Sequence, residues 1–373
     1  MTLQVDLGLA ALPMADTADR SRVLAGLGAD GVYTFEGSHD VFFPLVAAAS
    51  VPGLDLMTNV AIAFPRSPLH LAHAAWDLHE LCGGRFRLGL GSQVRPHIEA
   101  RYGATWSRPA ARMREQVLAV KAIFAAWEGK EPLRFKGEFF THTLMTPTFD
   151  PGPHPFGPPP VLVGALGPLM TQVAAEVADG VLVMPFNSER HVYERTLPAI
   201  DRGLAATGRT LDDLEIVVEV IVATGRTPDE LAAARAGVRR LLSFYGSTPS
   251  YRPVLDVEGW GELQPALNAM SKRGEWAAMS GLIDDAMVAT IGVAGAPEEC
   301  AAEIVRRYGG VARRVCLYFP GYDVADETVS ELVGAIHAAS HERGHGMVRP
   351  GAVGAVGGPW PLEPPTTTNE ETS

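Results

Sequence analysis

The chain has 373 residues, of which 47% are apolar, so it is long enough to bury a sizeable core in one large domain or two smaller ones. Its 43 acidic and 31 basic residues give a net charge of −12, which argues against binding to nucleic-acid phosphates. No apolar run approaches the roughly 18 residues of a membrane span, and the first residues do not resemble a signal peptide, so we expect a cytoplasmic protein without a membrane partner.

Short apolar runs alternate with segments of helical periodicity along most of the chain. The apolar runs, which we interpret as strands, cover residues 5–12, 31–36, 54–64, 85–91, 161–164, 181–185, 214–223 and 314–319. The helical segments cover residues 19–27, 44–50, 68–81, 109–127, 168–178, 188–206, 228–245, 297–308 and 327–342. The helix at 109–127 has the clearest pattern, because Met113, Val117, Val120 and Phe124 recur at spacings of three and four.

Three segments depart from this alternation. A short hairpin is predicted at 133–140, followed by a Pro/Gly-rich loop over 146–160. Residues 246–285 look irregular, and from 346 onward the chain is rich in Gly, Pro and Thr. We therefore expect one domain over residues 1–345, with insertions at about 130–158 and 246–285, and a disordered tail over 346–373.

Eight strands, each followed by a helix, favour an α/β fold of the closed (β/α)8 TIM-barrel type, with insertions. The competing architecture is a doubly wound open sheet with a second domain. It is disfavoured because no G-x-G-x-x-G sequence follows the first strand. In a barrel, functional groups gather in the loops after the strands, so those loops are the places to look for chemistry.

The loop after the second strand carries Glu36, Ser38, His39 and Asp40. These side chains offer an acid, a base and a hydrogen-bonding group, and a histidine can transfer protons near neutral pH. The alternative is a structural loop in which Ser38 and Asp40 cap the next turn and His39 is solvated. We expect His39 and Glu36 to be catalytic.

Two further loops follow the third and fourth strands. The apolar run over 54–64 is long for one strand, which suggests a bulge or kink near Asn59. Arg66 after it either meets an anion or pairs with a surface carboxylate. After the fourth strand, Gly91 permits close backbone approach, and Ser92 and Gln93 offer hydrogen-bond donors, although a plain tight turn has the same pattern.

The loop after the fifth strand contains Gly164, Ala165, Leu166 and Gly167 and runs directly into a helix that starts at Pro168. The free N–H groups and the dipole of a helix N-terminus favour an anion such as phosphate. The alternative is a purely structural turn.

Metal and hydrolase chemistry have little support. His70 and His73 are three residues apart on a helix, but no carboxylate completes an H-E-x-x-H motif, so no metal site is predicted. The three cysteines form no C-x-x-C pair, and no G-x-S-x-G motif is present. In the insertion, Tyr251, Trp260 and Trp276 either line a substrate pocket or pack the insertion onto the barrel.

Taken together, these loops resemble the luciferase-like monooxygenase superfamily, and more narrowly its coenzyme F420-dependent oxidoreductase branch. The resemblance spans about residues 3–342. It is carried by Ala61-Ile62-Ala63-Phe64-Pro65-Arg66-Ser67-Pro68, by Ala75-Trp76-Asp77-Leu78, by Gly83-Gly84-Arg85-Phe86-Arg87-Leu88-Gly89-Leu90-Gly91-Ser92-Gln93, by Val163-Gly164-Ala165-Leu166-Gly167-Pro168 and by Ala178-Asp179-Gly180.

The resemblance implies a barrel, commonly a homodimer, that binds a flavin or deazaflavin at its mouth and acts on a small organic substrate. It implies a non-proline cis peptide at Asn59-Val60, against the back of the cofactor ring. The family's contacts after the fourth strand fall on Gly91, Ser92 and Gln93. Its phosphate loop falls on Gly164, Ala165, Leu166 and Gly167.

One motif departs from the family. Many deazaflavin-dependent members have an Asp-His pair after the second strand, whereas this chain has Glu36-Gly37, and the nearest histidine is His39. Hydride transfer between coenzyme F420 and a small substrate is the function we expect, with His39 exchanging the proton and Glu36 holding or replacing it. The alternatives are an FMN-dependent two-component monooxygenase and a non-catalytic flavin-binding protein.

Overall fold

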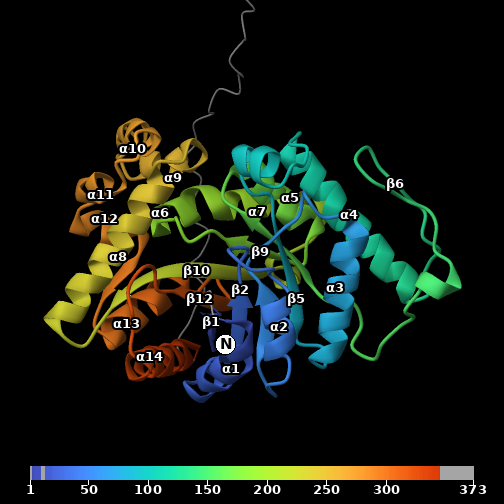
Figure 1. Ribbon diagram of the computed structural model, residues 1–373, viewed down its shortest axis with the longest axis horizontal. Helices are drawn as coiled ribbons and strands as arrows, with labels where there is room; N and C mark the ends of the chain where they lie inside the picture. Colours follow the sequence, from blue (N-terminus) through green and yellow to red (C-terminus); the bar gives the residue numbers. More distant parts are fainter. Residues whose placement is uncertain (1, 10–12, 345–373) are drawn as a thin grey trace, which may run out of the picture.

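The structure is a computed structural model that describes residues 2–9 and 13–344. Within this part, eight parallel strands close into a barrel surrounded by helices (Figure 1). The barrel strands are β1 (Gln4–Gly8), β2 (Gly31–Thr34), β3 (Asp55–Thr58), β5 (Phe86–Gly91), β8 (Val161–Ala165), β9 (Gly180–Val183), β10 (Glu215–Thr224) and β12 (Arg314–Tyr318). The pairing of β12 with β1 closes the ring, as predicted for a (β/α)8 fold.

The helices follow the predicted alternation closely. Those that surround the barrel are α1 (Thr17–Gly26), α2 (Phe43–Ala48), α3 (Pro68–Leu81), α4 (Pro109–Trp127), α5 (Pro168–Val177), α6 (Glu189–His191), α7 (Leu197–Thr207), α8 (Pro228–Gly246), α13 (Pro297–Tyr308) and α14 (Asp326–Gly344). A π-helical turn over Val192–Thr196 joins α6 to α7. No helix in the described residues combines the length and apolarity needed to cross a bilayer.

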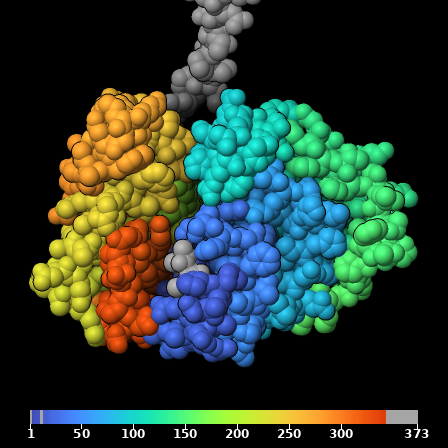
Figure 2. All heavy atoms as spheres, viewed as in Figure 1, coloured from blue at the N-terminus to red at the C-terminus, as the bar shows by residue number. Residues whose placement is uncertain are grey.

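The insertions lie on opposite sides of the face drawn in Figure 2, the first in green and the second in yellow to orange. The first contains an antiparallel hairpin of β6 (Phe135–Lys136) and β7 (Thr141–His142), close to its predicted position. The expectation of an irregular second insertion is wrong. It folds into α9 (Arg252–Val257), α10 (Leu263–Lys272) and α11 (Trp276–Met279), which lead to α12 (Asp285–Ile291) and to β11 (Val293–Gly295) beside β10.

Each helix of this insertion is short, and Gly259 and Gly274, both in the left-handed region, separate them. The glycines that interrupt the pattern therefore separate individual helices, and the prolines stand in the first turns of helices, so neither marks irregular chain. The predicted tail over 346–373 lies outside the described residues.

Two strand predictions also need correction. The long run at 54–64 is divided into β3 and a short β4 (Ala61–Ile62), with the Asn59-Val60 peptide between them in the cis form. The first strand ends at Gly8 and not at residue 12, although residues 10–12 are not described.

Alternation along β10 shows how the interior is layered. Ile216, Val218 and Val220 belong to the apolar layer between strands and helices, whereas Val217 packs inside the barrel with residues of other strands. Because side chains alternate along a strand, Glu215 and Glu219 face the interior like Val217. The barrel therefore has a charged floor, an apolar middle layer and a polar mouth.

The floor is a buried ionic network centred on Arg314 at the start of β12. Its fully buried guanidinium pairs with Asp6 on β1 and Asp55 on β3, and its Nε lies 3.7 Å from Glu215 on β10. Arg87 on β5 completes the network, at 3.0 Å from Asp55 and 2.9 Å from Glu215. Burial raises the pKa of Asp6 to about 6, against the opposing effect of Arg314.

We predict that Arg314→Met lowers the free energy of unfolding by about 3–5 kcal/mol, because the change leaves buried carboxylates without their counter-charge. Denaturant unfolding at pH 7 measures this loss. The matched control is Arg313→Met, since the neighbouring Arg313 is exposed. If Arg314→Met and Arg313→Met lower the free energy of unfolding by the same small amount, the ionic network does not contribute to stability as predicted.

Candidate functional site

The loops that the sequence singled out converge at the C-terminal ends of the strands. In the sheet, β2, β3, β5 and β8 are consecutive neighbours, so the residues that follow them lie along one arc of the barrel mouth. This arc brings together the segments that begin at Glu36, Asn59, Ser92 and Leu166. The mouth of a TIM barrel is where such loops form binding and catalytic sites.

Val60 occupies a fixed position at the centre of this arc. A Cβ atom added to Gly91 would lie 2.3 Å from Val60 Cγ2, and one added to Gly164 would lie 3.1 Å from Val60 Cγ1. The two glycines on β5 and β8 therefore leave the space that Val60 fills. Val60 itself is partly exposed, so it presents apolar surface at the mouth.

The cis peptide predicted at Asn59-Val60 is confirmed. Asn59 is buried, its backbone N–H donates to the Thr34 carbonyl at 2.6 Å, and its side-chain Nδ2 has no hydrogen-bond partner among the described residues. This amide is nevertheless close enough to the Glu219 carboxyl to lower its pKa, so Glu219 and a bound molecule can each accept from it.

Ser92 and Gln93 interact mainly with their own loop. The Ser92 hydroxyl donates to the Gln93 carbonyl at 3.2 Å, and Gln93 Oε1 accepts from the Val94 N–H at 3.0 Å. Gln93 has a φ of 58°, a left-handed conformation that turns the chain sharply after β5. Both side chains remain partly exposed at the mouth.

The loop Gly164–Gly167 leads into α5 as predicted. Gly167 occupies the N-cap position without a side-chain cap, and Pro168 is the first helical residue. Gly167 is exposed, and nothing lies within 4 Å of the place where its Cβ would be. Gly167, Pro168 and Leu169 are all exposed, so the start of α5 lies at the surface, where an anion can approach its free N–H groups.

Glu36 is held by Arg66. Its two carboxylate oxygens accept from Arg66 Nη1 at 2.7 Å and Nη2 at 2.8 Å, and Oε2 also accepts from the Ile62 N–H at 2.9 Å. Asp40 lies 3.4 Å from the same guanidinium. Arg66 is thus committed to carboxylates, the second of its two predicted alternatives.

His39 stands apart from this pair. It is exposed, and no hydrogen bond or ion pair joins it to Glu36 or to any other side chain in the described part of the chain. The basic residues after β5 are likewise directed elsewhere. Arg95 pairs with Glu99, and Arg101 donates to the Gly37 carbonyl at 2.9 Å.

Sequence reasoning missed Glu219 and Tyr33. Tyr33 Oη lies 3.4 Å from Glu219 Oε1 and 3.0 Å from the Leu317 carbonyl oxygen. Burial raises the pKa of Glu219 to about 8, while Tyr33 and Asn59 act in the opposite direction. Glu219 lies in the middle of the strand that joins floor and mouth, so no loop motif marks it.

Asn187 and His191, which follow β9, were also missed. Both side-chain polar atoms of Asn187 are buried without a hydrogen-bond partner, as is Nδ1 of His191. Burial, aided by Arg195, lowers the pKa of His191 to about 4, so this imidazole is neutral at pH 7. Neither residue lies in a recognisable motif, so no pattern in the sequence marks them.

The aromatic residues of the second insertion contribute mainly to packing. Tyr251 stacks on Phe186 and Tyr245, with ring centroids 6.1 and 5.9 Å apart. Trp276 lies over Phe244 at 6.2 Å. The packing alternative therefore describes Tyr251 and Trp276, and Trp260 also packs against the apolar cluster beneath the insertion.

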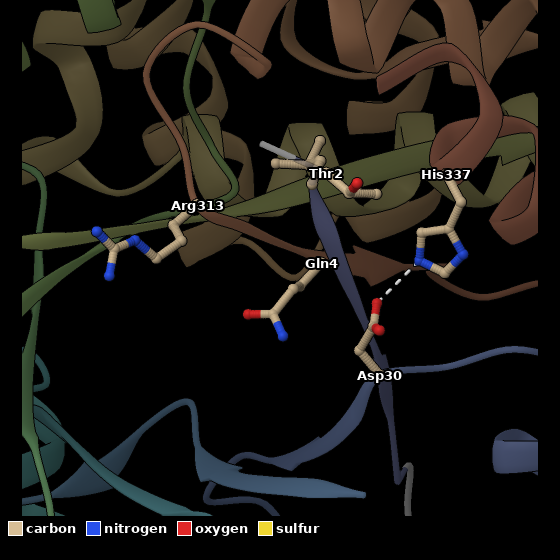
Figure 3. A pocket seen from close by; sticks show the side chains of 6 residues that line it. Thr2, Gln4, Asp30, Arg313 and His337 are labelled. Carbon is tan, nitrogen blue, oxygen red and sulfur yellow. Dashed lines mark hydrogen bonds and ion pairs between the residues drawn. The ribbon is translucent and has the colours of Figure 1, made fainter. Parts of the chain in front are cut away.

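A hollow lies at the end of the barrel opposite to the converging loops (Figure 3). It is lined by Thr2, Leu3, Gln4, Asp30, Arg313 and His337, and His337 Nε2 lies 2.8 Å from Asp30. Apart from His337 on α14, these residues precede β1, β2 and β12 or lie at the start of β1, so this hollow is on the floor side, away from the converging loops. Among the described residues, no cluster of three His, Cys, Asp or Glu side chains is arranged to hold a metal ion.

Comparison with known proteins gives consistent relatives. Residues 2–314 match the family model described as luciferase-like monooxygenase. An uncharacterized protein of Mycobacterium tuberculosis is 47% identical over 307 residues, which cover 82% of this chain and 90% of that protein. The 5,10-methylenetetrahydromethanopterin reductase of Archaeoglobus fulgidus is 32% identical over 266 residues, which cover 69% of this chain and 75% of the reductase.

Two solved structures share the fold. Coenzyme F420-dependent tetrahydromethanopterin reductase from Methanopyrus kandleri has a TM-score of 0.74 at 19% identity, covering 91% of this chain and 99% of that one. The oxygenating constituent of 3,6-diketocamphane monooxygenase from Pseudomonas putida, in complex with FMN, has a TM-score of 0.63 at 14% identity, covering 91% and 98%. At these identities the likeness concerns the fold alone.

We predict that Gly91→Ala lowers the free energy of unfolding by roughly 1–3 kcal/mol, because the new methyl group overlaps Val60. Adding Val60→Ala removes the overlapping Cγ2 atom and should recover part of this loss. A double-mutant cycle by denaturant unfolding measures the coupling. Gly167→Ala, with open space around it, is the control. If the effects of Gly91→Ala and Val60→Ala on the free energy of unfolding are additive, the predicted overlap between the two side chains is contradicted.

Proposed function

The chain belongs to the luciferase-like monooxygenase family, and from this premise we propose that it is an oxidoreductase that transfers a hydride between coenzyme F420, a deazaflavin, and a small organic substrate. The relative from Archaeoglobus fulgidus, named as a methylenetetrahydromethanopterin reductase, supports an oxidoreductase activity. The proposal includes a homodimer in the cytoplasm, as the resemblance implies.

The observation that carries the proposal is the Asn59-Val60 segment. Val60 offers a partly exposed apolar surface, held in place by Gly91 and Gly164, and Asn59 beside it has a buried amide donor without a partner. A planar heteroaromatic ring needs both, an apolar surface for its face and a donor for one of its polar edge atoms. The residues present therefore fit a flavin-type ring.

The phosphate of such a cofactor fits the N-terminus of α5. The loop Gly164–Gly167 is open at Gly167, and after Pro168, which has no N–H group, the N–H groups of Leu169 and Met170 in the first turn of α5 lack an intrahelical acceptor. We propose that Gly164, Ala165, Leu166 and Gly167 bind the phosphate, and that Gly91, Ser92 and Gln93 border the ring from the adjacent strand.

When bound, the deazaflavin supplies or accepts the hydride. The protein's own contribution is to hold the ring against Val60, so that the substrate meets one face in a fixed orientation. His39 is exposed after β2 and is free to exchange the accompanying proton. Glu36, engaged with Arg66 and the Ile62 N–H, fixes the path of the loop that carries His39.

The competing proposal is an FMN-dependent monooxygenase, in which the cofactor activates dioxygen. The solved monooxygenase with FMN favours it only through the fold. Both cofactors use a planar ring and a phosphate, so the features described above suit either one.

The test is a calorimetric titration of the purified protein with coenzyme F420 and, separately, with FMN. We expect F420 to bind more tightly. In Gly167→Asp, a carboxylate faces the phosphate, and the affinity should fall at least roughly fivefold by charge repulsion. Aspartate is also a favourable N-cap, so the folded state should be preserved.

Gly167→Ala is the matched control and should bind the cofactor as the wild type does, since its methyl group meets no neighbour. Tighter binding of FMN than of F420 would favour the FMN-dependent monooxygenase, and oxygen uptake during turnover would then be measured. Binding of neither cofactor would overturn both.

We predict that His39→Ala lowers turnover roughly 10²-fold or more, while the dissociation constant of coenzyme F420 stays within a factor of two or three. Turnover is followed by the oxidation of reduced F420 with a panel of small ketones, aldehydes and enones. His341→Ala, an exposed change on α14, is the control. Unchanged turnover in His39→Ala would remove His39 from the mechanism.

A further inference from the structure

Glu219 is a carboxyl group inside the barrel that the family resemblance does not use. Its partner Tyr33 is on β2, whereas Glu219 is on β10, and β1 and β12 separate these strands in the sheet. The contact therefore crosses the interior of the barrel. Glu219 keeps part of its surface exposed although the strand around it is buried. Because Glu219 follows the floor residue Glu215 and the middle-layer residue Val217 along β10, it lies on the mouth side of both.

The hydrogen bonds of Tyr33 indicate where the proton of this pair resides. A phenol has one proton, and the Leu317 carbonyl, 3.0 Å from Tyr33 Oη, can only accept. Tyr33 Oη is also 3.4 Å from Glu219 Oε1, to which the phenol can donate. If the single phenol proton goes to the nearer Leu317 carbonyl, a protonated Glu219 can instead donate to a lone pair of Tyr33 Oη. A Cβ atom on Gly8 would lie 3.3 Å from the Tyr33 ring, so this glycine makes room for the tyrosine.

The charged groups of the barrel do not compensate an ionised Glu219. No arginine, lysine or histidine forms an ion pair with it in the part of the chain that the structure describes. The arginines of the floor are already paired with Asp6, Asp55 and Glu215. A carboxylate without a counter-charge in a buried site is costly, so the neutral acid is favoured.

The titratable groups that face Glu219 come from three elements. They are Tyr33 on β2, Cys316 and Tyr318 on β12, and Tyr245 on α8. Burial raises the pKa of each of them above its ordinary value. Glu219 therefore titrates alone in this layer, with its pKa raised by burial to about 8.

We propose that Glu219 is the acid that gives a proton to the substrate inside the barrel, and that the substrate class is a carbonyl or imine compound. This inference rests on the proposed function, since the neighbouring Asn59-Val60 segment is where the cofactor ring would lie. Asn59 influences the Glu219 carboxyl directly, so the acid and the proposed ring site are adjacent.

The step is balanced as follows for a ketone. A bound reduced deazaflavin would supply the hydride, so its C–H bond would break, a C–H bond would form at the carbonyl carbon, and the cofactor would be left oxidised. The π pair of the C=O bond moves to oxygen, which takes the proton from Glu219, and the product is an alcohol. Glu219 is left as a carboxylate and acts as the base when the reaction runs in reverse. It regains its proton from water at the mouth, where His39 exchanges protons with solvent.

The first measurement needs no cofactor. Infrared spectra between pH 5 and 10 should show a protonated carboxyl band that disappears with a midpoint near 8 in the wild type and in the control Glu131→Gln, an exposed change. In Glu219→Gln this band should be missing. The separate band of Asp6, whose pKa is raised to about 6, should disappear with a midpoint near 6 in all three proteins. An ionised Glu219 at pH 6–7 would overturn the proposal.

The pH dependence of stability has the same origin. Because the pKa of Glu219 is raised in the folded state, its contribution is fully present below the pKa of the unfolded chain and is lost as pH rises toward about 8. Glu219→Gln should therefore gain thermal stability relative to the wild type between pH 5 and 9. If the difference in thermal stability between Glu219→Gln and the wild type does not change between pH 5 and 9, the raised pKa of Glu219 is contradicted.

Reaction with dicyclohexylcarbodiimide tests access from the mouth. A protonated carboxyl adds across one C=N bond, its proton moves to nitrogen, and the acylurea product is located by mass spectrometry. We expect labelling of Glu219 at pH 6–7, loss of labelling above pH 8, and protection by coenzyme F420. Absence of labelling, or labelling that bound F420 does not prevent, would overturn the role of Glu219. If calorimetry shows no F420 binding, the proposed function fails instead.

Turnover supplies the last readout, with reduced F420 and a panel of acetone, cyclohexanone and benzaldehyde. Glu219→Gln should slow the oxidation of reduced F420 by roughly 10²–10⁴-fold, with F420 affinity retained and Glu131→Gln at the wild-type rate. An undiminished rate in Glu219→Gln would overturn the proposal. If the wild type binds F420 but reduces none of these compounds, the proposed carbonyl substrate class is wrong. The protonation state of Glu219 is tested separately, by the infrared spectra.

Discussion

A buried guanidinium at the floor of the barrel ties together the strands on which the mouth depends. Arg314 begins β12, the strand that closes the ring between β10 and β1, and its partners are on β1, β3 and β10. Ion pairs of this kind contribute little net stability compared with an apolar core, but their hydrogen bonds are directional. The register Gln4↔Arg314 and Val217↔Arg314 is the one that brings these carboxylates to the guanidinium.

From that floor, the alternation of side chains determines what reaches the mouth. Two residues above Glu215 lies Val217, in the apolar middle layer with Tyr33 and Cys316, and two residues further lies Glu219. The same strand thus carries a carboxylate that is paired with arginine and a carboxyl that is not. Their protonation differs because their surroundings differ, although the residue type is the same.

The mouth is shaped by close packing as much as by polar groups. Val60 fits against Gly91 and Gly164, so the cis peptide at Asn59-Val60, the strand β5 and the loop before α5 form one surface. Residues that looked like separate motifs in three loops are thereby parts of a single arrangement. Arg66 links this arrangement to the loop after β2 through Glu36, which also accepts from the Ile62 N–H beyond the cis peptide.

The sequence alone determined the eight βα units, because strand and helix periodicities are local and repeat along the chain. It also indicated the loops that converge, and the resemblance identified the cis peptide. It misjudged residues 246–285, where short helices depend on packing against α8. It did not reveal the Tyr33–Glu219 contact, the Arg314 network or the Glu36–Arg66 pair, which join residues 186, 308 and 30 positions apart. Only the closed barrel decides which distant side chains share a layer and which of them lack a counter-charge, because burial and charge pairing depend on three-dimensional neighbours that no local pattern specifies.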